Sequence, residues 1–170
     1  MSRRMLPLVV LTFALGCLTA LAAPILPGSA KLPPEVQSLA GIEKVELIVQ
    51  GASPLVNDPT YLDNLRQTIT AVLEQGGVKV GKGADLPRLN IVLFTAISPA
   101  QPDVVGYTYH LSLEQQSTVE RLNKSLLLPT YALIHTELST RQRLQEDTRS
   151  VVPMLMNHFL SRIQLANNDE

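Results

Sequence analysis

Apolar and polar side chains alternate most regularly along residues 107–114, and this alternation predicts a β-strand. One face of the strand would carry aromatic and leucine side chains: Tyr107, Tyr109, Leu111 and Leu113. The other face would carry polar side chains: Thr108, His110, Ser112 and Glu114. Because successive side chains of a strand point to opposite faces, we expect the first set to pack in a core and the second to form a polar outer face.

Four further segments have the composition of strands, at residues 42–50, 78–80, 88–97 and 130–138. Both faces of the segment 88–97 are apolar, since Val92, Phe94 and Ala96 lie between the other hydrophobic positions. This pattern predicts a strand in the centre of a sheet. Pro129 lacks an N–H donor, so it confines the stretch before residue 130 to an edge strand or a bulge.

Helical spacing of apolar residues predicts two amphipathic helices. The first would begin at Asp58 and Pro59, a capping carboxylate followed by a proline in the first turn, and would end at Gly76 and Gly77. The second follows the polar residues 139–142 and buries one stripe: Leu144, Thr148, Val151, Leu155, Phe159 and Ile163. Pro153 predicts a kink in this helix, unless the helix begins near Ser150.

The predicted order is strand, helix, four strands and a final helix. Two amphipathic helices need a sheet face to cover. We therefore expect an α+β fold: a two-layer sandwich of about five mostly antiparallel strands, with both helices on one face.

Residues 1–23 have the pattern of a secretory signal. Arg3 and Arg4 precede an apolar run without charged side chains, which ends in the small residues of a cleavage site: Ala20, Ala22 and Ala23. We expect cleavage after Ala22, because cleavage one residue later would place Pro24 directly after the scissile bond. Two alternatives stay open, namely retention of residues 5–23 as a membrane anchor and lipidation at Cys17.

The chain is thus expected to contain a signal peptide at 1–22, a Pro-rich linker at 23–41, a single domain at 42–166 and a frayed tail at 167–170. The exported protein would work in the periplasm or elsewhere outside the cytoplasm. Loss of Arg3 and Arg4 would leave 12 basic against 15 acidic side chains, which gives no basic footprint for nucleic acid.

Cysteine usage narrows the chemistry further. Cys17 is the single cysteine of the chain and lies in the predicted signal. The mature domain would then have no disulfide, zinc–thiolate site, iron–sulfur cluster or cysteine nucleophile. The three histidines show no metal-ligand spacing, so we expect neither a metal nor a cofactor.

Three stretches carry a resemblance to a known family: residues 65–80, the alternating strand 107–115 and the sequence Asn157-His158-Phe159-Leu160. They are similar to a family of uncharacterised, small exported bacterial α/β proteins. The resemblance covers most of residues 42–166 and implies the fold, but no activity and no catalytic residues. The order of elements also resembles periplasmic α/β modules of envelope assembly, which are binding proteins.

One constellation suggests an enzyme. His135, Glu137 and Ser139 occupy alternating positions and would share a sheet face, as the groups of a hydrolase would need. No Gly-x-Ser-x-Gly elbow presents a nucleophile, and spacing along one strand does not by itself give a serine–histidine hydrogen bond.

Arg141, Arg143 and Arg149 surround Glu146 and Asp147, and this set could bind an anionic head group or a partner. The default interpretation is a solvated helix face of mixed charge.

We expect a non-enzymatic binding or assembly module that binds a protein partner in the cell envelope, with peripheral membrane association as a further option. The outer face (Thr108, His110, Ser112 and Glu114) and the three arginines are the candidate binding residues. The alternatives are a hydrolase centred on His135 and a carrier that holds a lipid-like molecule between sheet and helices.

Overall fold

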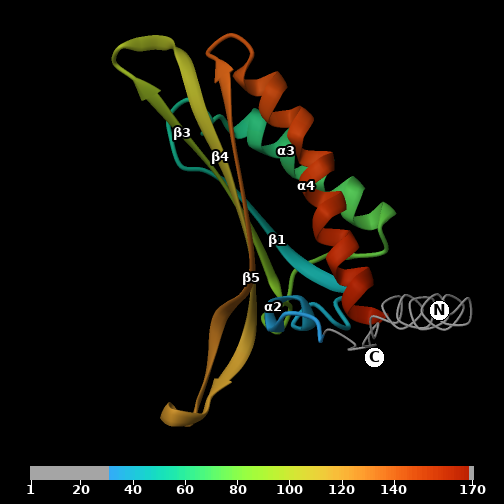
Figure 1. Cartoon of the computed structure of the whole chain (residues 1–170). Coiled ribbons are helices and arrows are strands. Elements are labelled where there is room, and N and C mark those ends of the chain that lie inside the picture. The colour runs from blue at the N-terminus through green and yellow to red at the C-terminus, as the bar shows by residue number, and fades with distance from the viewer. Residues whose placement is uncertain (1–30, 169–170) are drawn as a thin grey trace, which may run out of the picture. The chain divides into compact units, whose positions relative to one another are not determined.

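A computed structural model describes residues 31–168 of the chain. The predicted signal peptide with its cleavage residues Ala20, Ala22 and Ala23, the alternative lipidation site Cys17, and residues 169–170 lie outside this part. Figure 1 shows a curved sheet with two long helices on one face. The predicted α+β sandwich is confirmed.

The sheet contains β1 (Lys44–Gly51), β2 (Lys79–Val80), β3 (Arg88–Ser98), β4 (Gln101–Val119) and β5 (Lys124–Thr140), in the order β2-β1-β3-β4-β5. β1 is parallel to both β2 and β3, whereas β3, β4 and β5 form an antiparallel meander, so the sheet is mixed. The prediction that the apolar strand 88–97 is central is confirmed, because β3 lies between β1 and β4.

The helix α3 (Pro59–Gln75) follows from its capping residues. The carboxylate of Asp58 accepts a hydrogen bond from the Tyr61 N–H at 2.7 Å, and Pro59 occupies the first turn. After the helix, Gly77 adopts a φ of 88°, a conformation that glycine tolerates and other residues rarely adopt. Both predicted ends of this helix are confirmed.

The helix α4 (Leu144–Asn167) is continuous through Pro153, so a helix start near Ser150 is wrong. Pro153 is exposed and has no N–H for the carbonyl of Arg149, which also lies on the exposed side, where water can hydrate that carbonyl. The buried stripe of α4 is confirmed for all six predicted positions, among them Phe159 at 0% exposure.

Two ends of the domain differ from the sequence prediction. Within the predicted linker, α2 (Pro34–Gln37) forms a short helix, and Val36 and Leu39 are buried in the core. At the other end, Asn167 belongs to α4 rather than to a frayed tail, and its Oδ1 accepts a hydrogen bond from the Gly41 N–H at 2.8 Å. These apolar and polar contacts fix two short segments whose sequences, rich in proline or in polar residues, are typical of loops.

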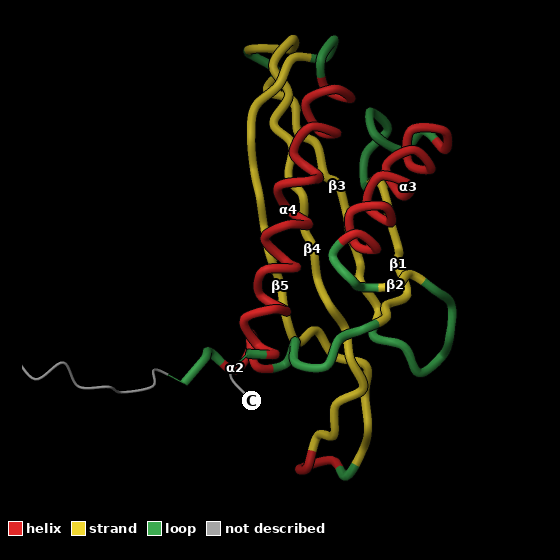
Figure 2. Tube along the Cα trace, turned by 90° about the vertical axis from the view of Figure 1, so that its right-hand side faces the viewer, coloured by secondary structure: helices red, strands yellow, loops and turns green. Residues whose placement is uncertain are grey.

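The strands β4 and β5 continue beyond the rest of the sheet as a two-stranded arm, residues 115–128 (Figure 2). A register shift where Glu114 pairs with Pro129 marks the base of this arm. The prediction that Pro129 lies at an edge or a bulge is therefore confirmed. The short 3-10 helix η1 (Glu120–Leu122) and Asn123, at a φ of 47°, form the tip.

Candidate functional site

The two faces of β4 differ as the sequence predicts. Tyr107, Tyr109, Leu111 and Leu113 are at most 1% exposed and face the helices. The opposite row, Thr108, His110, Ser112 and Glu114, lies on the sheet face that no helix of the described chain covers. This row is less accessible than an outer polar face would be, since Ser112 is buried and the other three are half-buried. The neighbouring strands β3 and β5 flank β4 on both sides and cover these side chains partly.

Large apolar side chains share this outer face. Register places three consecutive rows across β3, β4 and β5: Val92, His110 and Ile134; Phe94, Thr108 and Thr136; Ala96, Gly106 and Leu138. Phe94 is 45%, Ile134 65% and Leu138 76% exposed. We call Val92, Phe94, Ala96, Ile134 and Leu138 the outer-face patch.

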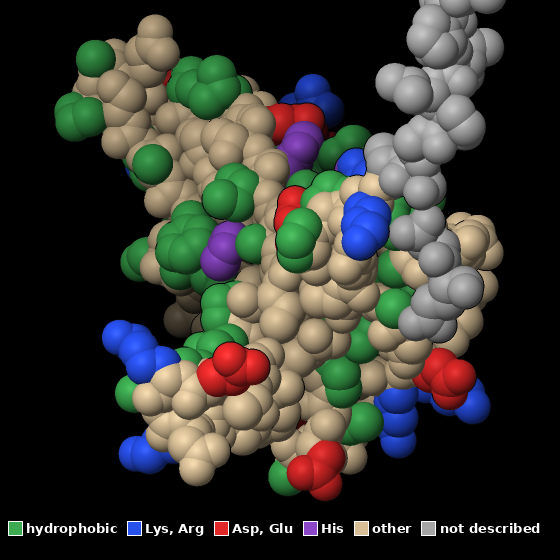
Figure 3. Space-filling model, turned by 60° about the horizontal axis from the view of Figure 1, so that its bottom comes forward, with side chains coloured by type: hydrophobic (Ala, Val, Ile, Leu, Met, Phe, Trp, Pro, Cys, Tyr) green, Lys and Arg blue, Asp and Glu red, His purple; other side chains and the backbone are tan. Residues whose placement is uncertain are grey.

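Glycine at position 106 contributes to the shape of this patch. A Cβ at Gly106 would lie 3.8 Å from Cδ2 of Leu138, so the leucine side chain extends across the glycine. In Figure 3 hydrophobic side chains gather beside a histidine on the left of the view. Several large apolar side chains exposed together on one face are a common feature of binding surfaces.

The sequence contained part of the signal for this patch. Val92, Phe94 and Ala96 make the second face of β3 apolar, a pattern that predicts a central strand. β3 is central in the sense that both of its edges pair with other strands. Its second face, however, has no helix above it among the described residues. The topology, which places both long helices on the other face, was needed to see that these side chains are exposed.

The residues of the hydrolase hypothesis lie at one end of the inner face. Nε2 of His135 lies 3.0 Å from Oε1 of Glu137, and the hydroxyl of Tyr107 donates to Oε2 of the same carboxylate at 2.7 Å. The distance between His135 and Glu137 suits an ion pair, but their geometry is not that of a hydrogen bond. Nε2 is buried without an aligned partner among the described residues.

Ser139 does not complete a catalytic set with His135. Its Oγ donates to Oδ2 of Asp147 at 2.7 Å, and Nη2 of Arg143 lies 3.0 Å from Oδ1 of the same aspartate. A serine nucleophile must donate its proton to the base that activates it. In the part of the chain that the structure describes, no serine hydroxyl donates to His135, so the arrangement joins β5 to the start of α4 rather than activating a nucleophile.

A second polar network lies inside the core between α3, β4 and α4. The hydroxyl of Tyr61 lies 2.6 Å from Oγ1 of Thr148, and the hydroxyl of Tyr109 donates to the backbone carbonyl of Thr148 at 2.9 Å. Burial raises the pKa of Tyr109 well above its usual value, because the phenolate would lose its hydration. The pKa of Tyr107 is raised by burial and by its hydrogen bond to Glu137.

The three arginines do not converge on one site. Nε of Arg141 donates to the carbonyl of Pro102 at 2.8 Å and so holds the turn between β3 and β4. Arg143 pairs with Asp147, and its Nε lies 4.0 Å from Oε2 of Glu146. Arg149 is exposed on α4. The interpretation as a helix face of mixed charge agrees with these contacts.

Neither a membrane-spanning helix nor a metal-binding cluster occurs within the described residues 31–168. None of the helices there is long and apolar enough to cross a membrane. No group of three or more histidine, cysteine, aspartate or glutamate side chains is placed to hold a metal ion there.

Comparison with known proteins identifies fold-level likeness alone. Neither a family model nor a curated protein matches the chain. A solved minor lipoprotein from Acinetobacter baumannii aligns with 75% of this chain and 93% of its own length, at 15% identity and a TM-score of 0.41. A solved PelC dodecamer from Paraburkholderia phytofirmans aligns with 73% of this chain and 87% of its own, at 14% identity and a TM-score of 0.37.

These scores are too low to support an argument about function. The resemblance to the family of small exported proteins stays a prediction, as does export itself.

Proposed function

We propose that this chain is a non-enzymatic binding module of the cell envelope, and that its outer sheet face binds a protein partner. The observation that carries the proposal is the outer-face patch, in which Phe94, Ile134 and Leu138 remain 45–76% exposed on a face without helices in the described chain. Removing such side chains from water is the main favourable contribution to protein association.

The surroundings of the patch support a protein rather than a small molecule as the ligand. The patch residues lie on β3 and β5, on either side of β4, whereas small ligands bind in concave pockets that enclose most of their surface. Polar residues lie among its apolar side chains: Thr108 and Thr136, whose hydroxyls are 2.9 Å apart, share the middle row with Phe94, and His110 lies between Val92 and Ile134. Protein interfaces commonly combine apolar contacts with hydrogen-bonding groups in this way.

The proposal can be tested with a photo-crosslinking amino acid introduced at Ile134 in the cell of origin. We expect a discrete crosslinked protein at this position. The same amino acid at Met154, which is 50% exposed on α4, provides a matched control on the helical side. Equal crosslinking at both positions, or none at Ile134, would contradict the proposal.

Replacing Phe94 and Leu138 together by threonine, with the crosslinking amino acid kept at position 134, should remove the crosslinked product, because the partner loses its apolar contact. Leu138→Thr should change the free energy of unfolding by about 0.5 kcal/mol or less, since this side chain is 76% exposed and threonine suits strands, whereas Phe94→Thr should lower it by about 1 kcal/mol because Phe94 is 45% exposed. Urea unfolding monitored by circular dichroism checks the second part. A variant that folds normally and still gives the full crosslinked product would place the interface elsewhere.

The polar row gives a milder prediction. Among the described residues no hydrogen bond or ion pair involves the side chain of His110 or Glu114. Changing both to alanine should therefore alter the free energy of unfolding by about 0.5 kcal/mol or less while weakening partner binding, as crosslinking yield and urea unfolding would report. Severe loss of folding would show that this row is needed for the core.

A further inference from the structure

Most of the edge of β1 that faces away from β3 is unpaired. Only Lys44 and Val45 of β1 pair with β2, because β2 ends at Val80, whereas β1 continues to Gly51. The last backbone hydrogen bond on this edge runs from the Gly81 N–H to the Val45 carbonyl at 2.9 Å. Beyond this bond β1 has a strand neighbour in the described chain on its β3 side alone.

The register shows which backbone groups are left on the open edge. The Glu46 N–H donates to Pro87 at 2.8 Å and the Ala52 N–H donates to Leu93 at 2.9 Å, so the even-numbered residues of β1 bond toward β3. In a parallel ladder the intervening residues bond toward the opposite side. The N–H and carbonyl groups of Leu47 and Val49 therefore point to the open edge, and no strand of the described chain pairs with them there.

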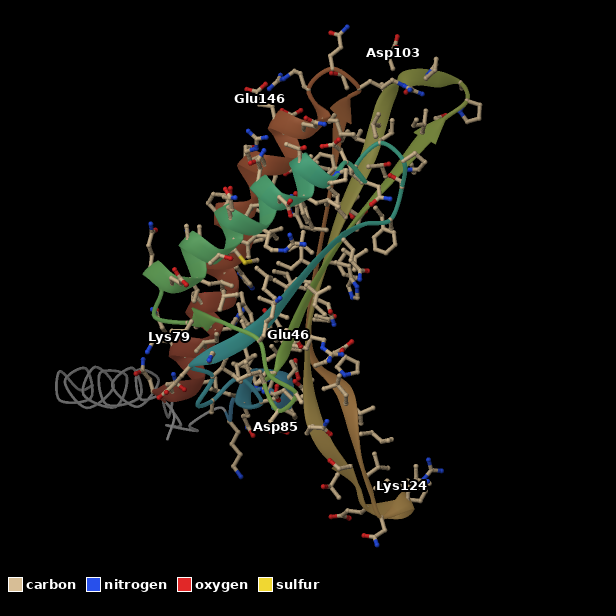
Figure 4. The ribbon with its side chains drawn as sticks, turned by 180° about the vertical axis from the view of Figure 1, so that it is seen from behind. Glu46, Lys79, Asp85, Asp103, Lys124 and Glu146 are labelled. Atoms are coloured by element: carbon tan, nitrogen blue, oxygen red, sulfur yellow. The ribbon has the colours of Figure 1, made fainter. Side chains whose placement is uncertain are left out.

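A groove follows this edge. Its volume is about 500 Å³, its floor is the segment from Glu46 to Val49, and Arg66 of α3 forms one wall. Gly81 and Lys82 close one end. Beyond the lining residues the loop after β1 folds back on the end of the strand, since a Cβ at Gly51 would lie 2.2 Å from the Val56 carbonyl oxygen. Figure 4 shows α3 running alongside β1, with Glu46 and Lys79 labelled.

The charges around the groove favour an acidic ligand. Its single lining acid, Glu46, is paired with Nε of Arg88 at 3.2 Å. Arg66 and Lys82 are the lining cations, and Lys44 lies across Gly81 at the closed end. Arg66 pairs with Asp63 on the helix surface, but exposed pairs of this kind contribute little, so a ligand carboxylate can compete for the guanidinium.

We propose that this groove binds an extended, acidic segment of a partner protein, which adds to the sheet as a strand beside β1 in the position that β2 leaves after Val80. Hydrogen bonds to the backbone of Leu47 and Val49 would supply affinity, and Arg66 and Lys82 would supply the preference for acidic side chains. This site lies at the opposite edge of the sheet from β5 and does not depend on the outer-face patch.

The probe is a pool of peptides of roughly seven residues, a length that spans β1 at about 3.3 Å per residue, with glutamate at alternate positions and random uncharged residues between. At about 1 mM pool, hydrogen exchange of the Leu47 and Val49 amides, measured by nuclear magnetic resonance, should slow. Peptides N-methylated on the bonding edge should bind at least about tenfold more weakly, because they cannot donate to β1.

The second part of the experiment tests the role of charge. The double variant Arg66→Glu and Lys82→Glu should lose about tenfold or more in affinity for the glutamate pool and prefer a matched lysine pool. The double variant Arg121→Glu and Lys124→Glu, at the tip of the arm, changes the net charge by the same amount, is the matched control and should bind like the unmodified chain.

Three results would overturn the proposal: no binding of the glutamate pool, protection on β5 instead of β1, or equal binding of the N-methylated pool. The variant with threonine at Phe94 and Leu138 separates this site from the proposed function. It should keep its affinity for the glutamate pool, whether or not it loses the crosslinked partner.

Discussion

Replacement of Phe159 by alanine should lower the free energy of unfolding by about 3–5 kcal/mol. The side chain is 0% exposed, and its ring lies 5.8 Å from that of Tyr131, centroid to centroid. Truncation would remove the apolar contact between α4 and β5 and leave a cavity that the rigid sheet cannot fill by collapse. The loss is a large share of the roughly 5–15 kcal/mol that stabilise a typical domain.

Urea unfolding monitored by far-ultraviolet circular dichroism measures this loss. Met154→Ala is the matched control on the same helix, because Met154 is 50% exposed and its truncation should cost about 0.5 kcal/mol or less. An unchanged midpoint for Phe159→Ala would mean that α4 does not pack on the sheet through this position.

Alkaline pH should unfold the protein through its buried tyrosines. Burial raises the pKa of both Tyr109 and Tyr107 in the folded protein, and unfolding returns each phenol to water and to a pKa of about 10. Below pH 10 both states hold the phenolic protons, so the stability contribution is fully present. Above pH 10 the unfolded state alone releases them, and the free energy of unfolding falls until the folded-state pKa is reached.

The expected slope is about 1.4 kcal/mol per pH unit for Tyr109, or about 2.5 kcal/mol between pH 10 and 12, and Tyr107 adds less because its hydroxyl bonds to the half-exposed carboxylate of Glu137. Tyrosine ionisation, read from ultraviolet absorbance, should therefore coincide with loss of the circular dichroism signal. In Tyr109→Phe most of the slope should be lost, whereas Tyr107→Phe should reduce it less. Phenolate formation near pH 10 with secondary structure intact would show that these tyrosines are accessible in the folded state.

Local patterns predicted most of the elements because their causes are local. The capping carboxylate of Asp58, the glycines after α3 and the strict alternation along β4 act within a few residues, and the structure confirms each. The spacing of apolar residues also predicted the buried stripe of α4, including Phe159. Spacing alone could not show that the helix continues through Pro153, because this depends on contacts of α4 with the sheet that outweigh the lost hydrogen bond.

Features that depend on strand order could not be predicted from the sequence. Whether Phe94 is exposed depends on which face the helices cover, and whether Leu47 has a free edge depends on how early β2 ends. The hydrogen bonding around His135 and Ser139 is a similar case. His135 and Ser139 share a face as predicted, but Asp147 from the next helix accepts the hydrogen bond of Ser139, and spacing along one strand could not show this.

The mixed sheet also imposes an order on folding. β3, β4 and β5 are joined by hairpins, so their ladders form from contacts between neighbours in the sequence. Glu46 of β1, in contrast, must find Arg88 across a closed loop that contains α3 and β2, at a greater cost in chain entropy. α4 follows all the strands in the chain, so the apolar side of the meander is exposed to solvent until Leu144 and the residues after it pack on it. A partly folded chain without α4 in place would expose apolar side chains on both sides of the sheet, and such states are prone to aggregation.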